Sequence, residues 1–298
     1  MKKKLPVVSD FDVAGKNVLV RGDFDVDDKD NPRIDSVRRI IEWLNGRRLK
    51  KIKVVGHTET KYPVVEDLRR EFPGVEFDDS LRKNPGEKEN SEEFAAQMAR
   101  GWEVYVNEAF ATSHRKHCSI YALPRLMKKQ NKQVGVGLRF EKELEMLPQI
   151  WSRPGRRVLV IGGVKVDEKE KFADSMKDKF AVVLKGGLLP GVDLRPDGLD
   201  ISDQTISEYV EIVKTADVIL AAGVMGKYED PTAVKGTKAV LEAIANSNAY
   251  KVAGGGDIER AIDMFGLTDK FDWISVGGGA MLEYLDKGTL PGIEAICL

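Results

Sequence analysis

The sequence predicts an α/β fold built from two doubly wound parallel sheets, and three observations predict it. The chain has 298 residues, which suits two domains of ordinary size. Short β-branched runs alternate with segments of helical spacing along the whole chain, the pattern typical of parallel sheets covered by helices. In the second half, each of five apolar runs ends in glycine. Since ligands of such sheets bind at the carboxyl ends of the strands, these glycines indicate a binding edge.

In the first half, four strands and three helices are expected from periodicity. The strands are residues 17–20, 52–56, 104–106 and 134–136. Apolar residues recur from Ile34 to Leu44 at helical spacing, which predicts a helix with Asp35 as its N-cap. Residues 90–93 resemble a capping box for a second helix, and a charged helix is expected over roughly 140–150.

The second half repeats one unit, an apolar strand followed by glycine and then by a helical pattern. The expected strands are residues 158–161, 181–184, 218–221, 250–253 and 273–276. The glycines that follow them are Gly162, Gly163, Gly186, Gly187, Gly223, Gly254, Gly255, Gly256, Gly277, Gly278 and Gly279. A single glycine pair most simply ends a strand tightly. Five such ends in one half instead favour a phosphate-binding edge, because glycine and free helix N-termini let the backbone approach an anion.

The charged residues beside this edge could bind a ligand or could have an ordinary structural role. Lys165 and Lys169 lie four residues apart, so on one helix face they could reach a phosphate chain or form an ordinary solvated lysine face. Asp257 directly follows three glycines. It could hold Mg²⁺ that bridges nucleotide phosphates, or it could cap a helix N-terminus.

Several other classes of protein are disfavoured by the sequence. There is no P-loop motif, and no strand is followed by the dinucleotide-binding G-x-G-x-x-G. The acidic run 23–30 lacks the glycine and final glutamate of a calcium loop, since Asp28 and Ile34 occupy those positions. His114, His117 and Cys118 have no second cysteine pair to complete a zinc site.

Composition favours a cytoplasmic globular protein without a nucleic-acid or membrane partner. The formal net charge is −1, so no basic excess indicates nucleic acid. No segment approaches 18 apolar residues, and the basic start lacks the apolar run of a signal peptide. The two cysteines form no C-x-x-C pair, which suits reduced thiols in the cytoplasm.

Seven segments, taken in order, resemble the phosphoglycerate kinase family. They are residues 20–26 (VRGDFDV), 81–87 (LRKNPGE), 105–117 (YVNEAFATSHRKH), 162–169 (GGVKVDEK), 236–239 (GTKA), 254–257 (GGGD) and 275–280 (SVGGGA). The resemblance implies two doubly wound domains joined by a helical hinge. The phosphoglycerate-binding domain would comprise 1–139 with 286–298, the hinge helix 140–151, and the nucleotide-binding domain 152–285.

The resemblance also assigns roles to individual residues. The acid would meet Asp23, Asp25, Arg33, His57, Arg82 and Arg115. The nucleotide would meet Gly162, Gly163, Lys165, Lys169, Gly186, Gly187, Gly223, Glu229, Gly255, Gly256, Asp257, Gly277 and Gly278, with Glu229 on the ribose and Asp257 linked to Mg²⁺. Catalysis would rest on Arg33, Lys165, Gly256 and Gly279.

The family reaction is the reversible transfer of a phosphoryl group between 1,3-bisphosphoglycerate and ADP, giving 3-phosphoglycerate and ATP. The resemblance therefore implies a Mg²⁺-dependent phosphotransferase of glycolysis, working as a hinge-bending monomer in the cytoplasm. Because the acceptor is a carboxylate, no strong general base is required. Catalysis would come from positioning and from charge neutralisation by Arg33, Lys165 and Mg²⁺.

The sequence also departs from the family pattern. Asp25, Thr60, Ala222 and Ile258 stand where asparagine, arginine, asparagine and threonine are expected. The chain is shorter before Arg82 and between Gly187 and Val218, where the family walls its adenine pocket; residues 191–198 would replace part of that wall. Two alternatives follow: a non-catalytic relative that binds ligands as a regulatory module, and a kinase with a different acid or nucleotide preference.

Overall fold

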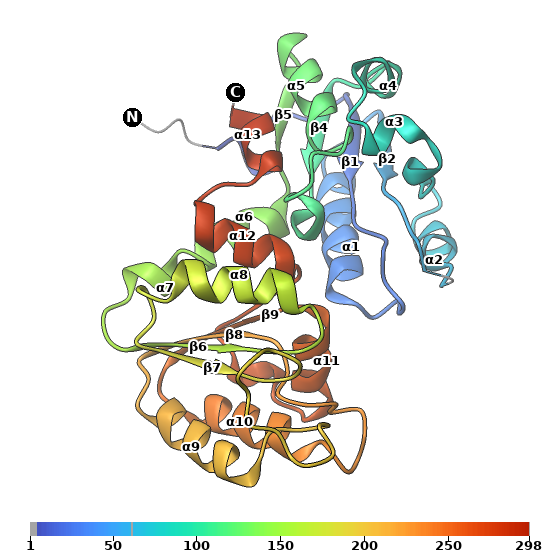
Figure 1. Cartoon of the computed structure of the whole chain (residues 1–298). Helices are drawn as coiled ribbons and strands as arrows, with labels where there is room; N and C mark the ends of the chain where they lie inside the picture. Colours follow the sequence, from blue (N-terminus) through green and yellow to red (C-terminus); the bar gives the residue numbers. More distant parts are fainter. Residues whose placement is uncertain (1–4, 61, 298) are drawn as a thin grey trace. The chain divides into compact units, whose positions relative to one another are not determined.

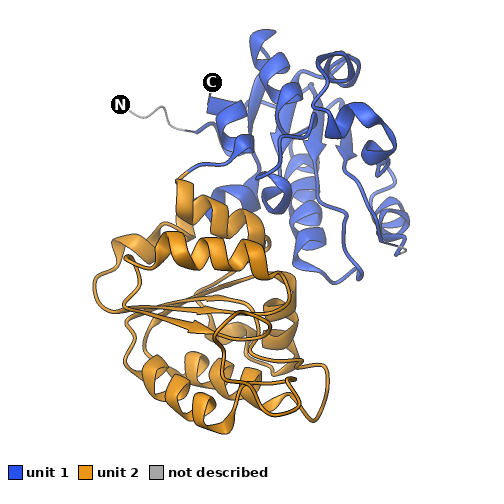
Figure 2. Cartoon of the chain, viewed as in Figure 1, with its two compact units in different colours: residues 1–144, 289–298 blue, residues 145–288 orange. Residues whose placement is uncertain are grey.

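The computed structural model describes residues 5–60 and 62–297, and it divides the chain into two compact units. Unit 1 comprises Met1–Leu144 and Thr289–Leu298, and unit 2 comprises Glu145–Gly288 (Figure 2). Residues 1–4, 61 and 298, all within the ranges predicted for the acid-binding domain, lie outside the described residues. The predicted domain boundaries and the hinge role of 140–151 stay predictions.

Unit 1 is built on a five-stranded parallel sheet of order β3-β2-β1-β4-β5. Its strands are β1 (Asn17–Arg21), β2 (Lys51–Val55), β3 (Glu76–Asp78), β4 (Val104–Asn107) and β5 (Gln133–Val136). All four residues of β4 are buried, as expected for a parallel strand covered on both faces. Strand β3 was not predicted, because its single apolar residue, Phe77, gives no alternating pattern.

Among the residues that the structure describes, seven α-helices of unit 1 surround this sheet (Figure 1). They are α1 (Pro32–Asn45), α2 (Val64–Glu71), α3 (Pro85–Lys88), α4 (Glu92–Met98), α5 (Ala122–Lys129), α6 (Leu138–Met146), which continues into unit 2, and α13 (Pro291–Cys297). Short 3₁₀ turns are η1 (Val8–Asp10), η2 (Leu81–Lys83) and η3 (Phe110–Thr112).

The structure corrects two predicted helix starts. Helix α1 begins at Pro32 and not behind Asp35, because the Asn31 side chain accepts the backbone N–H of Arg33 (3.0 Å) and so caps the helix. Helix α4 is capped by Ser91, whose hydroxyl accepts the N–H of Phe94 (3.2 Å). In both cases a better-placed capping residue lies close to the predicted one.

The prediction of one charged helix over roughly 140–150 is also wrong. Helix α6 ends at Met146, and a separate turn of helix, α7 (Gln149–Ser152), follows it. Pro148 lies between them. Proline has no N–H to donate and disfavours helical geometry in the residue before it, so it ends the first helix and starts the second.

Unit 2 contains a second five-stranded parallel sheet, of order β10-β9-β8-β6-β7. Its strands are β6 (Arg157–Ile161), β7 (Val182–Lys185), β8 (Val218–Ala222), β9 (Tyr250–Gly254) and β10 (Trp273–Ser275). Its remaining helices are α8 (Val166–Met176), α9 (Asp203–Lys214), α10 (Lys235–Asn246), α11 (Gly256–Met264) and α12 (Gly278–Lys287), with a 3₁₀ turn η4 (Thr268–Lys270). Helices α9 and α10 pack together on one face, and α8 and α12 on the other (Figure 1). This confirms the predicted class: two doubly wound α/β domains.

The last helix of the chain belongs to unit 1. Helix α13 packs against α5 and β5. Its end is held by the Lys128 ammonium, which donates to the Ile296 carbonyl (2.6 Å), and its start by the Gly292 N–H, which donates to the Ser113 carbonyl (3.0 Å). Within the described residues, no helix is long and apolar enough to cross a bilayer.

Candidate functional site

The carboxyl edge of the unit 2 sheet gathers the predicted glycines. Strands β6, β7, β8 and β9 lead directly into Gly162, Gly186, Gly223 and Gly255, and β10 leads through Val276 into Gly277. Because all five strands are parallel neighbours, their glycine ends lie along one edge. The edge that the sequence predicts is therefore present in the fold.

The glycines of this edge divide into two groups. A Cβ on Gly162 would meet the Val224 carbonyl and lie 2.9 Å from the Gly186 backbone, and a Cβ on Gly278 would lie 2.8 Å from the Gly255 Cα. These glycines let neighbouring loops pack backbone to backbone. A Cβ on Gly256 would meet nothing within 4 Å. Gly256 begins helix α11, and the first backbone N–H groups of a helix have no partner within it, which suits an approaching anion.

The side chains of Lys169 and Asp257 both approach Gly163. A Cβ built on Gly163 would lie 3.1 Å from the Lys169 ammonium and 4.0 Å from the Asp257 Oδ2. The Lys169 ammonium donates to the Gly162 carbonyl, and burial lowers the pKa of Lys169 while the Asp257 charge opposes that shift. A partly desolvated lysine and a carboxylate thus share the end of β6.

The other predicted nucleotide residues lie around this pair at the surface. Lys165 is exposed and forms the N-cap of α8, one turn before Lys169. Glu229 is exposed in the loop after β8, and Gly279 is exposed in the first turn of α12. Tyr228, which the sequence did not single out, is buried; burial first, and then the charges of Glu229 and Asp257, raise its pKa to about 12.

Two large apolar side chains are exposed beside the same edge. Val164 is 69% exposed and Leu188 is 59% exposed. Their loops are joined, since the Leu188 N–H donates to the Gly163 carbonyl (3.1 Å). The two residues of this unit that were expected to differ from the family pattern are both buried. Ala222 ends β8, and Ile258, in the first turn of α11, packs in the core of unit 2. Both side chains are apolar, so neither adds a polar group to the glycine edge.

In unit 1, three of the residues predicted for the acid, Asp23, Asp25 and Arg33, lie in the segment that follows β1. Arg33, near the start of α1, lies 3.6 Å from the Asp23 Oδ2 and donates to the Asp25 carbonyl (3.3 Å). The Asp25 carboxylate accepts the backbone N–H of Glu59 (2.9 Å) and so holds the loop that follows His57. Arg33, Asp23 and Asp25 therefore form one connected cluster.

The loop after His57 also brings in the predicted Arg82. The Thr60 hydroxyl donates to the Val26 carbonyl (2.7 Å), which ties this loop to the segment after β1. The Glu59 carboxylate then accepts a hydrogen bond from the Arg82 guanidinium. Sequence reasoning missed Glu59, because its partner lies 23 residues away in another loop.

A buried polar network supports His57 from below. Arg21 is fully buried; it donates to the Ser119 hydroxyl (3.0 Å), and its Nη2 lies 3.1 Å from His57 Nδ1. Ser119 in turn donates to the buried Glu87 carboxylate (2.6 Å). Arg21 ends an apolar run, which is the signal that could have marked it as a buried, functional charge.

Both histidines of this cluster are neutral at pH 7. Burial, followed by the charges of Arg21 and Arg82, lowers the pKa of His57 to about 3. Burial and the charges of Arg21, Arg115 and Arg82 lower the pKa of His117 to about 4, and its ring lies 6.3 Å from that of His57. Buried nitrogens on both rings, His57 Nε2 and His117 Nδ1, have no hydrogen-bond partner among the described residues. The site therefore offers polar groups for a ligand.

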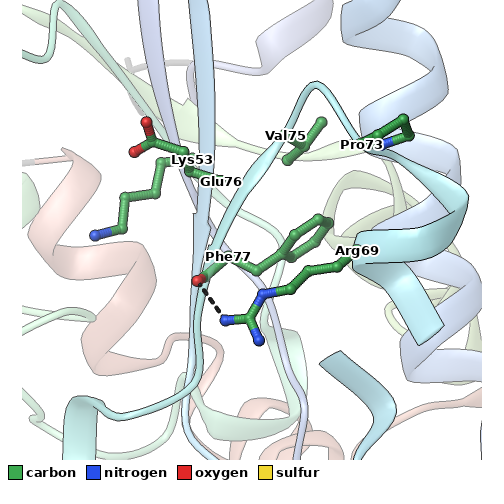
Figure 3. A pocket seen from close by; sticks show the side chains of 6 residues that line it. All are labelled: Lys53, Arg69, Pro73, Val75, Glu76 and Phe77. Atoms are coloured by element: carbon green, nitrogen blue, oxygen red, sulfur yellow. Dashed lines mark hydrogen bonds between the residues drawn. The ribbon is translucent and has the colours of Figure 1, made fainter. Parts of the chain in front are cut away.

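A hollow of about 470 Å³ in unit 1 contains none of these residues. It lies at the edge strand β3 and is lined by Lys53, Arg69, Pro73, Val75, Glu76 and Phe77 (Figure 3). Arg69 donates to the Phe77 carbonyl (3.1 Å). This bond covers a backbone acceptor on an otherwise open strand edge, a structural role.

No group of three or more histidine, cysteine, aspartate or glutamate side chains is poised to hold a metal in the part of the chain that the structure describes. Asp257 is instead a single half-buried carboxylate beside the open backbone of Gly256. Mg²⁺ takes one or two carboxylates and completes its shell with phosphate oxygens and water. Asp257 therefore suits a Mg²⁺ ion that is bound mainly by the phosphates of a nucleotide.

The family model for phosphoglycerate kinase matches residues 75–192 and 191–288. Among curated relatives, the phosphoglycerate kinase of Bdellovibrio bacteriovorus is 28% identical over 396 aligned positions, covering 99% of this chain and 98% of the relative. That of Solibacter usitatus is 32% identical, covering 73% of this chain and 70% of the relative. The first alignment is longer than this chain, so that relative has stretches that the chain lacks.

Solved structures share the fold over the full length. The phosphoglycerate kinase of Pyrococcus horikoshii superposes with a TM-score of 0.82 at 24% identity, covering 97% of this chain and 98% of that one. That of Coxiella burnetii gives a TM-score of 0.81 at 22% identity, covering 98% of each chain. Together with the match over residues 75–288, these findings show that the chain belongs to the phosphoglycerate kinase family.

Proposed function

We propose that this chain catalyses reversible phosphoryl transfer between 1,3-bisphosphoglycerate and ADP, giving 3-phosphoglycerate and ATP. Membership of the family supports a kinase that acts on a carboxyl group. The observation that carries the proposal is the edge of unit 2, where Lys169 and Asp257 both approach Gly163 beside the start of α11. A cation, a carboxylate and free N–H groups together suit a nucleotide phosphate chain with its metal.

In this proposal, unit 2 binds the nucleotide. Lys165 and Lys169 contact the phosphates, and the backbone at Gly256 and Gly279 donates to the phosphoryl group at two helix starts. Glu229 accepts from the ribose hydroxyls. The apolar pair Val164 and Leu188 offers the base a flat surface, in place of the wall that the shortened segment after Gly187 cannot form.

Mg²⁺, bound through Asp257 and the phosphates, would neutralise charge on the transferring group. The glycine ends of the other strands (Gly162, Gly186, Gly187, Gly223, Gly255, Gly277 and Gly278) would shape the surface on which the phosphates lie. The protein itself contributes N–H donors and ammonium groups in a fixed arrangement. These groups need not reorient when negative charge develops on the phosphoryl group in the transition state.

Unit 1 is proposed to bind the phosphoglycerate. Arg82, Arg115 and the neutral His57 would hold its anionic groups, and Asp23 would accept from its hydroxyl. Arg33, held at the start of α1 by Asp23 and Asp25, would stabilise the phosphoryl group in transfer. Since the acceptor is already a carboxylate and His57 stays unprotonated at pH 7, no proton has to be removed.

A coupled assay with 3-phosphoglycerate and MgATP tests the proposal. We expect turnover by the wild type and at least about a hundredfold loss in kcat for Lys165→Ala, the size typical of one lost charge-stabilising donor. Wild-type turnover no greater than that of Lys165→Ala would remove the proposal. Binding of 3-phosphoglycerate by calorimetry without any turnover would instead favour a non-catalytic binding module.

We also propose a cytoplasmic monomer with no nucleic-acid or membrane partner. The even balance of charge supports the absence of a nucleic-acid partner, because no basic excess is encoded. Light scattering on the purified protein, at several concentrations, measures the mass directly. A mass near 33.2 kDa that does not rise with concentration is the expected result.

A further inference from the structure

The acid site of unit 1 contains a carboxylate that the assigned roles leave without a function. Glu59 lies in the loop after β2, and its carboxylate accepts from the Arg82 guanidinium. Arg82 is one of the groups proposed to hold the ligand anion. The pairing therefore puts a protein carboxylate where a ligand's negative charge is needed.

Three contacts build this loop so that Glu59 reaches Arg82. The Asp25 carboxylate accepts the Glu59 N–H (2.9 Å). The Thr60 hydroxyl donates to the Val26 carbonyl (2.7 Å) and lies 3.0 Å from the Thr58 hydroxyl. Asp25 and Thr60 are two positions at which the sequence departs from the family pattern. Here they have a shared consequence: both anchor the loop that carries Glu59.

The Glu59–Arg82 ion pair can be broken by a ligand. The Arg82 side chain is only 14% exposed, whereas that of Glu59 is 56% exposed. A solvated carboxylate in an ion pair gains little from its partner, so a ligand anion can displace it. The buried Nε of Arg82 has no hydrogen-bond partner within the described residues. Glu59 therefore satisfies the guanidinium only in part.

The charges around the site show what Glu59 changes. The charges of Arg21 and Arg82 act on His57, those of Arg82 and Lys88 act on Glu59, and the two histidines are neutral. Asp23 and Asp25 lie beside Arg33. Because the Arg82 hydrogen bond lowers the pKa of Glu59, this carboxylate is ionised at pH 7. Glu59 therefore offsets part of the positive charge that Arg82 offers a ligand. An acid with a phosphate group has more negative charge than this balance favours.

We propose that Glu59 is a specificity-determining residue of the acid site, an internal carboxylate that competes for Arg82 and selects against phosphorylated acids relative to acids with a carboxylate alone. The inference rests on the proposed function for the location of the acid site. Glu59 acts on ligand binding through Arg82 and touches no reacting atom, so it affects KM for the acid and leaves kcat unchanged.

The test is Glu59→Gln, which keeps the size of the side chain and removes its charge. Calorimetry would measure the dissociation constants of 3-phosphoglycerate and glycerate, and steady-state kinetics with saturating MgATP would give KM and kcat. We expect the variant to bind 3-phosphoglycerate about three- to tenfold more tightly, as for a removed charge at a partly solvated site, with less than twofold change for glycerate. KM should fall by the same factor at constant kcat.

Two further variants complete the experiment. Glu71→Gln removes another exposed glutamate of unit 1 that pairs with an arginine, Arg38, at 2.9 Å, and should leave all constants unchanged. Glu59→Asp keeps the charge on a shorter side chain and should lie between wild type and Glu59→Gln. Equal selectivity in wild type and Glu59→Gln, or weaker binding of 3-phosphoglycerate by the variant, overturns the inference.

The outcomes separate this inference from the proposed function. If the wild type turns over 3-phosphoglycerate and Glu59→Gln has the same KM, the function stands and the inference fails. If no variant shows turnover while Glu59→Gln binds 3-phosphoglycerate more tightly, the inference stands and the function fails.

Discussion

The two units meet an anion in different ways. In unit 2 the candidate phosphate edge is made of backbone, with open space at Gly256 and few side chains. In unit 1 the candidate acid site is made of side chains, and its arginines already contact carboxylates such as Asp23 and Glu59. A backbone site depends on glycine packing that cannot adjust. A side-chain site can be tuned by one added charge, such as that of Glu59 beside Arg82.

The largest expected effect is on the side-chain site, from Arg21→Met. Arg21 is fully buried and contacts Ser119 and His57, so its removal leaves buried polar groups without partners. We expect the free energy of unfolding to fall by about 3–5 kcal/mol. Urea unfolding followed by circular dichroism measures this, with the exposed Arg47→Met as the control. A loss below about 1 kcal/mol would show that the network does not stabilise unit 1.

The backbone site is tested by a pair of matched glycine substitutions. In Gly162→Ala the new Cβ meets the Val224 carbonyl and the Gly186 backbone, so we expect a loss of about 1–3 kcal/mol. In Gly256→Ala the Cβ meets nothing within 4 Å, so stability should change little while MgADP binds more weakly. Thermal unfolding and calorimetry give both quantities. Equal losses of stability in the two variants would contradict the division into packed and open glycines.

A smaller effect is expected from pH in unit 1. Burial raises the pKa of Glu108 to about 8, although the Arg139 N–H donates to its carboxylate (2.8 Å). Above its ordinary pKa of 4.5, the unfolded chain releases this proton while the folded chain keeps it. Stability must therefore fall as pH rises towards 8.

Glu108→Gln isolates this contribution from that of the histidines, which act in the opposite direction below pH 6.5 because their pKa values are lowered. The difference in unfolding free energy between wild type and variant should change by up to about 1.4 kcal/mol per pH unit between pH 5 and pH 8, in favour of the variant at high pH. Urea titrations at four pH values measure it. A difference that does not vary with pH would mean that Glu108 is ionised throughout.

The sequence predicted the backbone site better than the side-chain site, for a physical reason. A glycine after an apolar run marks a strand end locally, so the edge from Gly162 to Gly278 could be found without any knowledge of tertiary contacts. The Glu59–Arg82 pair joins two loops whose meeting depends on the sheet order, and no local pattern indicates it. Strand β3 was missed because three residues are too few to show a period.

Helix ends show the same limit at closer range. Asn31 and Ser91 cap their helices because their side chains accept hydrogen bonds from the backbone N–H groups of Arg33 and Phe94. In the sequence, Asp35 and Asn90 are equally suitable capping residues by type. Pro148, by contrast, was a visible breaker within the predicted helix.

Calorimetric titration of the wild type and Lys169→Met with MgADP tests the central claim most directly, that the glycine edge of unit 2 binds nucleotide phosphates. Lys169 reaches the end of β6 beside Gly163 and Asp257. Loss of one charge-assisted contact there should weaken MgADP binding by about 30–100-fold while the fold is retained. The same affinity in both proteins would contradict the claim and place the nucleotide elsewhere.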